Sequence, residues 1–219
     1  MTFPTERRLM IDTCLKLQDM EYFIGTWGNV SVRVEDRILL TPSRVVYSEM
    51  RPEDIVVIDM GGGKLEGHRN PTSEKEVHRQ IYRKRANVQA IIHAHTPNAM
   101  AVSAMELDEV PCLVEEMSQL LGGSIPLSQA YICAERHVEL GEAAAAAIGD
   151  RNAVILRNHG PVACGHDLAE AMLAVRIQEK ACGLYLKAVA SGFSLHLIPK
   201  EQVASERFRY LHTYGKEKV

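Results

Sequence analysis

Residues 88–97 have the sequence VQAIIHAHTP, in which a strand pattern changes abruptly to a helix-start pattern. The run at 88–94 is typical of a buried strand, whereas Thr96 and Pro97 are typical of a helix cap and a first-turn proline. Because side chains alternate along a strand, His93 and His95 should share one face, about 7 Å apart along the chain. The stretch therefore predicts an α/β protein with two imidazoles at the end of one strand.

Strand and helix patterns alternate on both sides of this stretch. The helix that starts near residue 72 should be capped by a box formed by Ser73 and Glu76, and the last helix by Asp167 together with Glu170. The expected helices span 4–25, 72–85, a segment from 96 onward, 135–148 and 167–190, and the other expected strands span 30–34, 38–41, 55–59, 153–156 and 162–164.

The early strands are separated by short turns and not by helices. Such turns favour a mixed, partly antiparallel sheet over a doubly wound parallel one, because parallel neighbours need long crossover connections. A chain of 219 residues lies within the size of one domain with one hydrophobic core. We therefore expect a single α/β domain over residues 1–219.

The composition favours a small-molecule partner. A formal charge of −3 without a long basic run argues against nucleic acid, and no segment has the roughly 18 uncharged apolar residues of a membrane span. The 5 cysteines are scattered without a close pair, which is typical of reduced thiols. The N-terminal segment lacks the uninterrupted apolar region of a signal peptide, so a cytoplasmic location is expected.

Three histidines are candidate metal ligands. His93 and His95 could converge on one ion of the zinc class, although two surface histidines at a strand end would give the same pattern. His159 follows a β run and lies in a Gly-Pro turn that could direct it to a site, or simply into water. The other histidines, expected to be solvated, are at positions 68, 78, 137, 166, 196 and 212.

Two further segments could belong to a functional site. Thr72, Ser73 and Glu74 combine two hydroxyls with a carboxylate at a helix N-terminus, which could bind phosphate or could be an ordinary cap. The turn that contains Gly28 and Asn29 is rich in glycine, as many turns into strands are, and could simply terminate a helix. Neither segment is specific when taken alone.

Five short motifs occur together in an order that is typical of one family. They are Gly28-Asn29-Val30-Ser31, Thr41-Pro42-Ser43, Pro71-Thr72-Ser73-Glu74, His93-Ala94-His95 and Asn158-His159-Gly160. By these motifs the chain resembles the class II aldolase/adducin family, from its first helix to Thr213-Tyr214-Gly215. The resemblance implies a three-layer α/β/α fold with a central mixed, largely antiparallel sheet. It also implies a C4 homotetramer whose active sites lie between subunits.

The resemblance also implies roles for individual residues. His93, His95 and His159 would hold one Zn²⁺ per subunit, or Co²⁺ or Mn²⁺ as substitutes, and Glu74 would bind the metal or act as acid/base. Tyr214 of an adjacent subunit would give a proton to the aldehyde oxygen. The implied phosphate pocket contains Gly28, Asn29, Ser43, Thr72 and Ser73.

The activity implied is that of the family's aldolases, among them those that act on L-fuculose 1-phosphate. Such an enzyme is a metal-dependent aldehyde-lyase of carbohydrate metabolism. It cleaves a ketose 1-phosphate, here including a deoxy or modified pentulose phosphate, reversibly to dihydroxyacetone phosphate and an aldehyde. The metal would stabilise an ene-diolate, and no lysine imine is required.

Three positions depart from the aldolase pattern. Ser43-Arg44 stands where those aldolases have Thr-Gly, so Arg44 is a candidate for holding an anion. Glu116 stands where they have a tyrosine, which would change the contacts to the aldehyde half. The family's sugar-phosphate 4-epimerases have an aspartate at the position of Gln119, and glutamine cannot transfer protons in its place.

The sequence leaves two alternatives to aldol cleavage. One is epimerisation or decarboxylation of a sugar phosphate at the same metal site, which Gln119 disfavours. The other is a non-catalytic scaffold like the adducin head, which lacks a working metal site. The presence of all three histidines and of Glu74 argues against the scaffold.

Overall fold

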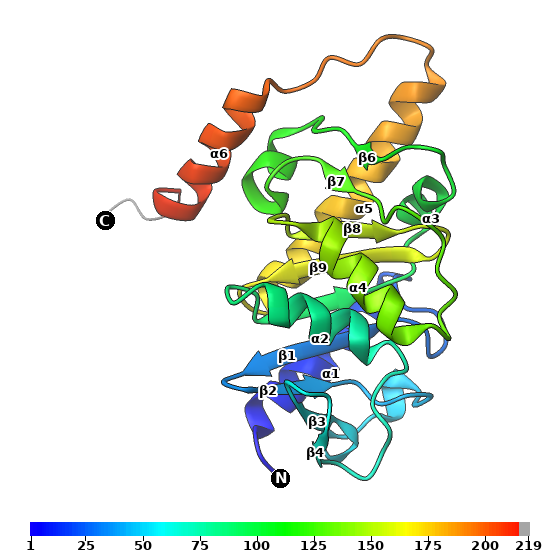
Figure 1. The fold of residues 1–219 in the computed structure, drawn as a ribbon, viewed down its shortest axis with the longest axis vertical. Helices are drawn as coiled ribbons and strands as arrows, with labels where there is room; N and C mark the ends of the chain where they lie inside the picture. Colours follow the sequence, from blue (N-terminus) through cyan, green and yellow to red (C-terminus); the bar gives the residue numbers. More distant parts are fainter. Residues whose placement is uncertain (215–219) are drawn as a thin grey trace.

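The computed structural model describes residues 1–214 and is built on one large β-sheet. Its 7 strands follow the order β4-β3-β2-β1-β5-β9-β8, and every neighbouring pair is antiparallel (Figure 1). The strands are β1 (Asn29–Val34), β2 (Arg37–Leu40), β3 (Val56–Asp59), β4 (Lys64–Glu66), β5 (Ala90–His93), β8 (Ala153–Leu156) and β9 (Gly160–Gly165). The largely antiparallel sheet is as predicted, although β4 follows a glycine turn that gave no strand signal.

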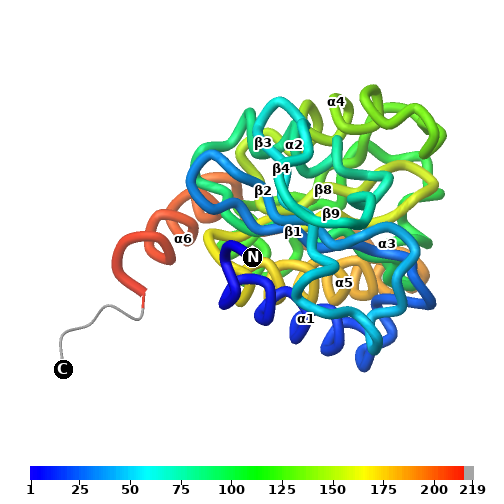
Figure 2. The backbone as a smooth tube through the Cα atoms, turned by 90° about the horizontal axis from the view of Figure 1, so that it is seen from below, coloured from blue at the N-terminus to red at the C-terminus, as the bar shows by residue number. Residues whose placement is uncertain are grey.

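Helices cover both faces of the sheet, and Figure 2 shows the sheet lying between them. On one face lie α2 (Lys75–Lys84) and α4 (His137–Ile148); on the other lie α1 (Pro4–Asp19), α3 (Pro97–Ser103) and α5 (Leu168–Ala190). Strand alternation creates the two cores, because Ile38 and Leu40 pack with α2 and α4 whereas Leu39 packs on the opposite face. The three-layer α/β/α arrangement is confirmed.

The two helices of the first face approach each other closely. Gly141 of α4 makes this possible, because a Cβ atom there would lie 2.5 Å from the backbone oxygen of Glu76 in α2. The contact fixes the position of α2. It therefore also fixes Glu74, the residue that immediately precedes this helix.

Smaller elements complete the described chain. They are a two-stranded sheet of β6 (Glu109–Val110) and β7 (Ile125–Pro126), the 3-10 turns η1 (Tyr47–Glu49) and η2 (Pro52–Asp54), the π-helical turn η3 (Met117–Leu121) and helix α6 (Lys200–His212). Helix α6 has no buried residue and extends from the body of the molecule after an irregular segment (Figure 1). No helix within residues 1–214 is long and apolar enough to cross a membrane. Gly215 lies outside the described residues.

Two predictions about helix ends are wrong: the C-terminal end of α1 and the capping box at the N-terminal end of α2. Helix α1 ends at Asp19 and not near Gly25, since Glu21 adopts a left-handed conformation that interrupts the helix. The predicted capping box is absent, because Glu74 occupies the N-cap and the Glu76 carboxylate instead accepts hydrogen bonds from Arg79. The cap of α5 is confirmed, as the Asp167 side chain accepts a hydrogen bond from the amide of Glu170.

Candidate active site

Three histidine side chains meet at one end of the central strands. His93 is the last residue of β5, and His95 follows two positions later, just beyond the strand. His159 lies in the turn between β8 and β9, and it reaches the other two because β9 pairs with β5. The candidate ligand nitrogens of the three rings lie within 4.8 Å of one another. The sequence left open whether His93, His95 and His159 face one site or face water, and in the structure the three side chains meet at one point.

A glycine beside the cluster allows this convergence. A Cβ atom on Gly160 would lie 2.6 Å from the backbone oxygen of Ala94 and 3.1 Å from the ring of His95. Only a residue without a side chain lets the turn that carries His159 come so near to the end of β5.

Hydrogen bonding fixes the tautomer of His93. Its Nδ1 lies 3.0 Å from the carbonyl oxygen of Pro161, and a carbonyl can only accept, so Nδ1 carries the proton. Complete burial lowers the pKa of His93 to about 3, so the ring is neutral. The pKa of His95 is also lowered, chiefly by burial. His93 therefore directs a free Nε2 lone pair into the cluster, where the His95 Nε2 lies 3.2 Å away.

Glu74 closes the cluster from the start of α2. Its Oε1 lies 2.9 Å from Nε2 of His159 and its Oε2 lies 3.3 Å from Nε2 of His93. Burial, the largest influence, would raise the pKa of Glu74. The hydrogen bonds that His159 and Asn29 donate to the carboxylate nevertheless hold that pKa well below its usual range. Glu74 is therefore a buried carboxylate.

These four side chains fit a divalent metal ion. Donor atoms that bind one tetrahedral zinc at about 2.0–2.1 Å lie about 3.3 Å from one another, and the distances from Nε2 of His93 to His95 and to Glu74, 3.2 and 3.3 Å, are close to that value. The free lone pair of His93 faces a carboxylate oxygen of Glu74 at 3.3 Å. Two acceptors repel at this distance, and a shared cation would turn the repulsion into attraction.

The cluster borders a cavity of about 370 Å³. All the residues that the sequence singled out for phosphate binding line the same cavity as the metal candidates. They are Gly28, Asn29, Ser43, Arg44, Thr72 and Ser73, with Glu74, His95 and His159. An anion at the N-terminus of α2 would therefore lie beside the histidine cluster.

Arg44 adopts an unusual backbone conformation at the rim of this cavity. Its φ is +60°, in the left-handed region that favours glycine, and its side chain is exposed. The family resemblance predicts glycine at this position, so the backbone keeps the glycine-like shape while the residue is a cation. This strain of about 1–2 kcal/mol lies at a candidate binding site.

Two residues near the cavity were missed or misjudged from the sequence. Trp27, the only tryptophan, lines the cavity and is exposed, with its ring 6.2 Å from that of His95. His78 was expected to be solvated, but it is fully buried and hydrogen-bonded to Asn29 and Ser31. Its spacing of four residues after Glu74 was the available signal, because such residues lie near the same face of a helix.

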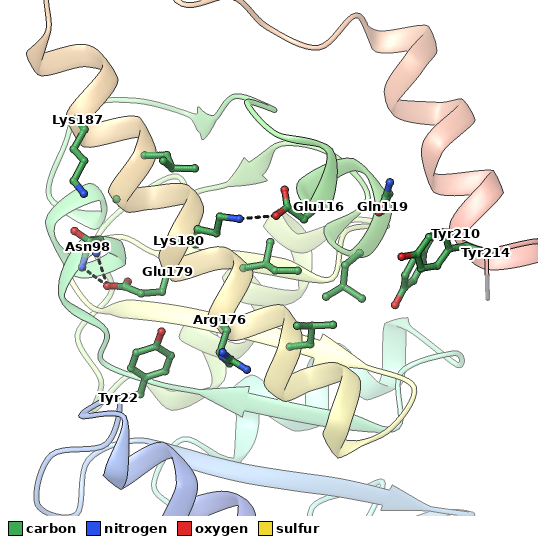
Figure 3. Close-up of a pocket in the computed structure, with 15 residues that line it drawn as sticks. Tyr22, Asn98, Glu116, Gln119, Arg176, Glu179, Lys180, Lys187, Tyr210 and Tyr214 are labelled. Atoms are coloured by element: carbon green, nitrogen blue, oxygen red, sulfur yellow. Dashed lines mark hydrogen bonds and ion pairs between the residues drawn. The ribbon is translucent and has the colours of Figure 1, made fainter.

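Glu116 and Tyr214 do not join the histidine cluster within one chain. Both line a separate cavity of about 700 Å³ between α5, the π-helical turn and α6 (Figure 3). There the Glu116 carboxylate lies 2.5 Å from the ammonium of Lys180, which lowers the pKa of Glu116 mainly through this hydrogen bond. This cavity is larger, but it lacks the three-histidine cluster.

Comparison with known proteins agrees with the geometry. The family model described as "Class II Aldolase and Adducin N-terminal domain" matches residues 8–186. The chain belongs to the class II aldolase/adducin family. Among the relatives of this class II aldolase, the L-fuculose phosphate aldolases of Haemophilus influenzae and Escherichia coli (strain K12) are 32% and 34% identical to it. The alignments cover 94% and 95% of this chain, and 93% and 94% of the relatives.

A solved structure of the family confirms the predicted fold. An L-fuculose 1-phosphate aldolase superposes on this class II aldolase with a TM-score of 0.90 and 29% identity. The match covers 96% of this chain and 98% of that one. The similarity therefore extends beyond residues 8–186, the segment matched by the family model.

Proposed function

We propose that this class II aldolase is metal-dependent and cleaves a ketose 1-phosphate to dihydroxyacetone phosphate and an aldehyde. The substrate resembles L-fuculose 1-phosphate or is a deoxy or modified pentulose phosphate. One observation carries the proposal: a three-histidine cluster with a buried carboxylate borders the same cavity as a helix N-terminus with two hydroxyls. A phosphorylated ketose needs both features, one for its phosphate and one for its carbonyl end.

The metal in this proposal is zinc, with Co²⁺ or Mn²⁺ as substitutes, held by His93, His95 and His159 with Glu74. Neutral imidazoles suit this group of ions. The bound ion would supply Lewis-acid stabilisation of the negative charge that develops on the substrate oxygens. Release of the metal by a chelator should therefore stop the reaction.

The protein's own groups divide the remaining tasks. Thr72, Ser73 and the turn at Gly28 bind the phosphate. In the condensation direction, Glu74 takes a proton from the hydroxymethyl carbon of dihydroxyacetone phosphate, and the electron pair left there forms the bond to the aldehyde carbon. Tyr214 of a second copy gives its hydroxyl proton to the aldehyde oxygen, and cleavage runs the same steps backwards.

The role of Tyr214 requires an assembly, which we propose to be the C4 homotetramer of the family. Two observations support it. Within one chain, Tyr214 and Glu116 border a different cavity from the histidines. In addition, α6 buries none of its residues, and Phe208 and Tyr214 are 63% and 57% exposed. A neighbouring subunit would cover these apolar side chains and bring Tyr214 to another histidine cluster.

The aldolase proposal is favoured over its alternatives. An epimerase would need an acid at the position of Gln119, but the amide of Gln119 cannot transfer protons and donates a hydrogen bond to Glu206 at 2.8 Å. A scaffold would not need the shared cavity. We also propose a cytoplasmic location, which agrees with the free thiols of all 5 cysteines.

A screen of phosphorylated ketoses tests the proposal. We expect metal-loaded enzyme to release dihydroxyacetone phosphate from at least one ketose 1-phosphate, as followed by a coupled assay for that product. Borohydride with substrate should leave the activity intact, because no imine forms. Inactivation by borohydride would reject the metal mechanism, and a product with an unchanged carbon count would indicate epimerisation.

Replacing Arg44 by glycine should separate its binding role from its backbone strain. We expect the KM for the phosphorylated substrate to rise about tenfold, because a charged hydrogen-bond donor is lost. Stability should stay equal or rise slightly: relief of about 1–2 kcal/mol of strain offsets about 0.4–1 kcal/mol of added unfolded-state entropy. Steady-state kinetics and thermal unfolding measure the two effects.

The matched control is Arg44→Asn. Asparagine tolerates the left-handed conformation and lacks the charge, so this variant should show the same rise in KM. An unchanged KM in both variants would remove Arg44 from the substrate site.

A further inference from the structure

A row of buried polar side chains lies behind the candidate site. The Tyr82 hydroxyl is 2.8 Å from Oγ of Ser31, which in turn is 2.7 Å from Nδ1 of His78. Nε2 of His78 is 2.5 Å from Oδ1 of Asn29, and Nδ2 of Asn29 is 2.7 Å from Oε2 of Glu74. Ser31, His78, Tyr82 and Asn29 are each at most 3% exposed. The row therefore links the interior of the protein to the candidate acid/base.

Chemistry fixes the direction of the two bonds nearest the site. A carboxylate oxygen of Glu74 accepts the hydrogen bond from Nδ2 of Asn29, so the nitrogen of the Asn29 amide faces Glu74. The oxygen of that amide consequently faces His78 and requires a donor. Nε2 of His78 must therefore carry a proton.

The remaining bonds follow from the charge state of His78. Burial lowers the pKa of this fully enclosed histidine to about 3, so the ring is neutral and Nδ1 has no proton. Ser31 must then donate to Nδ1. The Tyr82 hydroxyl, which burial keeps protonated by raising its pKa, donates in turn to Ser31. Every proton between Tyr82 and Glu74 has one consistent position.

We propose that His78 is a positioning residue that locks the orientation of the Asn29 amide and, through it, the carboxylate of Glu74. Without a donor at Nε2, only the bond to Glu74 holds the Asn29 amide, so the side chain is free to shift and carry its nitrogen away from the carboxylate. Glu74 would then lose a hydrogen bond that holds it beside His93 and His159. This inference rests on the proposed function only in giving Glu74 a catalytic role.

The hydrogen bond from His78 to Asn29, here called the lock, also leaves part of the Asn29 amide available to a ligand. One N–H of its amide is held by Glu74, and the residue lines the cavity. The second N–H of the same group is therefore oriented by His78 as well. Loss of the lock should affect both turnover and the binding of a phosphorylated substrate.

Two variants of His78 separate positioning from simple packing. In His78→Gln, the amide nitrogen can take the place of Nε2 and keep the bond to Asn29 while the bond from Ser31 is lost. In His78→Asn, the amide oxygen can take the place of Nδ1 and keep the bond from Ser31 while the bond to Asn29 is lost. Each variant leaves one buried polar group without a partner, so both should lower the thermal unfolding midpoint similarly.

The kinetic result should differ between the two variants. We expect kcat of metal-saturated His78→Asn to fall about 10–100-fold, whereas His78→Gln should stay within about fivefold of the wild type. The KM for the phosphorylated ketose should also rise more in the asparagine variant. Equal losses of kcat in the two variants at equal stability would overturn the proposal, because a packing role would affect both alike.

A spectroscopic readout does not depend on activity. In protein labelled with ¹⁵N-histidine, the His78 signals, assigned by their loss in His78→Gln, should show a protonated Nε2 and an unprotonated Nδ1 from pH 5 to 9. A proton on Nδ1 would overturn the proposal. If the wild type fails to cleave any ketose phosphate, the proposed function falls, while the tautomer of His78 still decides whether the lock exists.

Discussion

Replacing His93 by alanine is expected to remove the bound metal and to reduce aldol cleavage by at least about 10³-fold. His93 lies in the middle of the cluster: its Nε2 is 3.2 Å from the His95 ring nitrogen and 3.3 Å from the Glu74 carboxylate. It is also fully buried, and its tautomer is set by Pro161. Metal content per subunit, measured by mass spectrometry, and the rate of dihydroxyacetone phosphate release test this expectation.

The control for His93 is His196→Ala. This histidine is exposed in the segment between α5 and α6, so its loss should change neither metal content nor rate. Wild-type protein that contains no stoichiometric metal after growth in metal-replete medium would instead favour the scaffold alternative. Retention of metal by His93→Ala would show that the cluster is not the site.

Mixed assemblies extend the same experiment to the proposed tetramer. His93→Ala and Tyr214→Phe subunits each damage a different cavity of the chain. If Tyr214 acts on a neighbouring subunit, co-expressed mixtures should recover activity that neither variant has alone, because some neighbours combine an intact cluster with an intact tyrosine. Mixtures that are no more active than either variant would place the action of Tyr214 elsewhere.

Local sequence patterns predicted those parts of the site that depend on a single element. The alternation in 88–95 placed His93 and His95 together, and the start of α2 placed Thr72 and Ser73 at a helix N-terminus. The meeting of His159 with His93 was beyond such patterns, because it depends on β9 pairing with β5 across the sheet. The joint occurrence of five motifs supplied that information through family resemblance.

Errors in the sequence analysis arose where tertiary contacts outweigh local preference. Ser73 and Glu76 have capping-box spacing, but Arg79 competes for the Glu76 carboxylate. The only local signal for His78 is its spacing of four residues after Glu74, and its burial results from β1 lying against the start of α2 through Asn29 and Ser31. Helix α6 lacked a strong apolar face, and its place in the fold depends on few buried groups.

Glu74→Gln is expected to keep the metal largely bound while reducing turnover by about 10² or more. The amide has nearly the same shape as the carboxylate and can still accept the hydrogen bond from Asn29. The three imidazoles that remain are sufficient ligands for zinc in proteins. The amide cannot, however, take a proton from carbon, so single-turnover kinetics of the metal-loaded variant should show a slow chemical step.

The matched control is Glu76→Gln, the same substitution two residues further along the chain. Glu76 is also buried at the start of α2, but its carboxylate pairs with Arg79 at 2.6 Å and does not line the cavity. Glu76→Gln should therefore lower the thermal unfolding midpoint and leave kcat unchanged, since it breaks a buried ion pair that does not contact substrate. If Glu74→Gln instead retains full activity with metal bound, the proton must move through another group. The carboxylate would then serve only to neutralise the cluster.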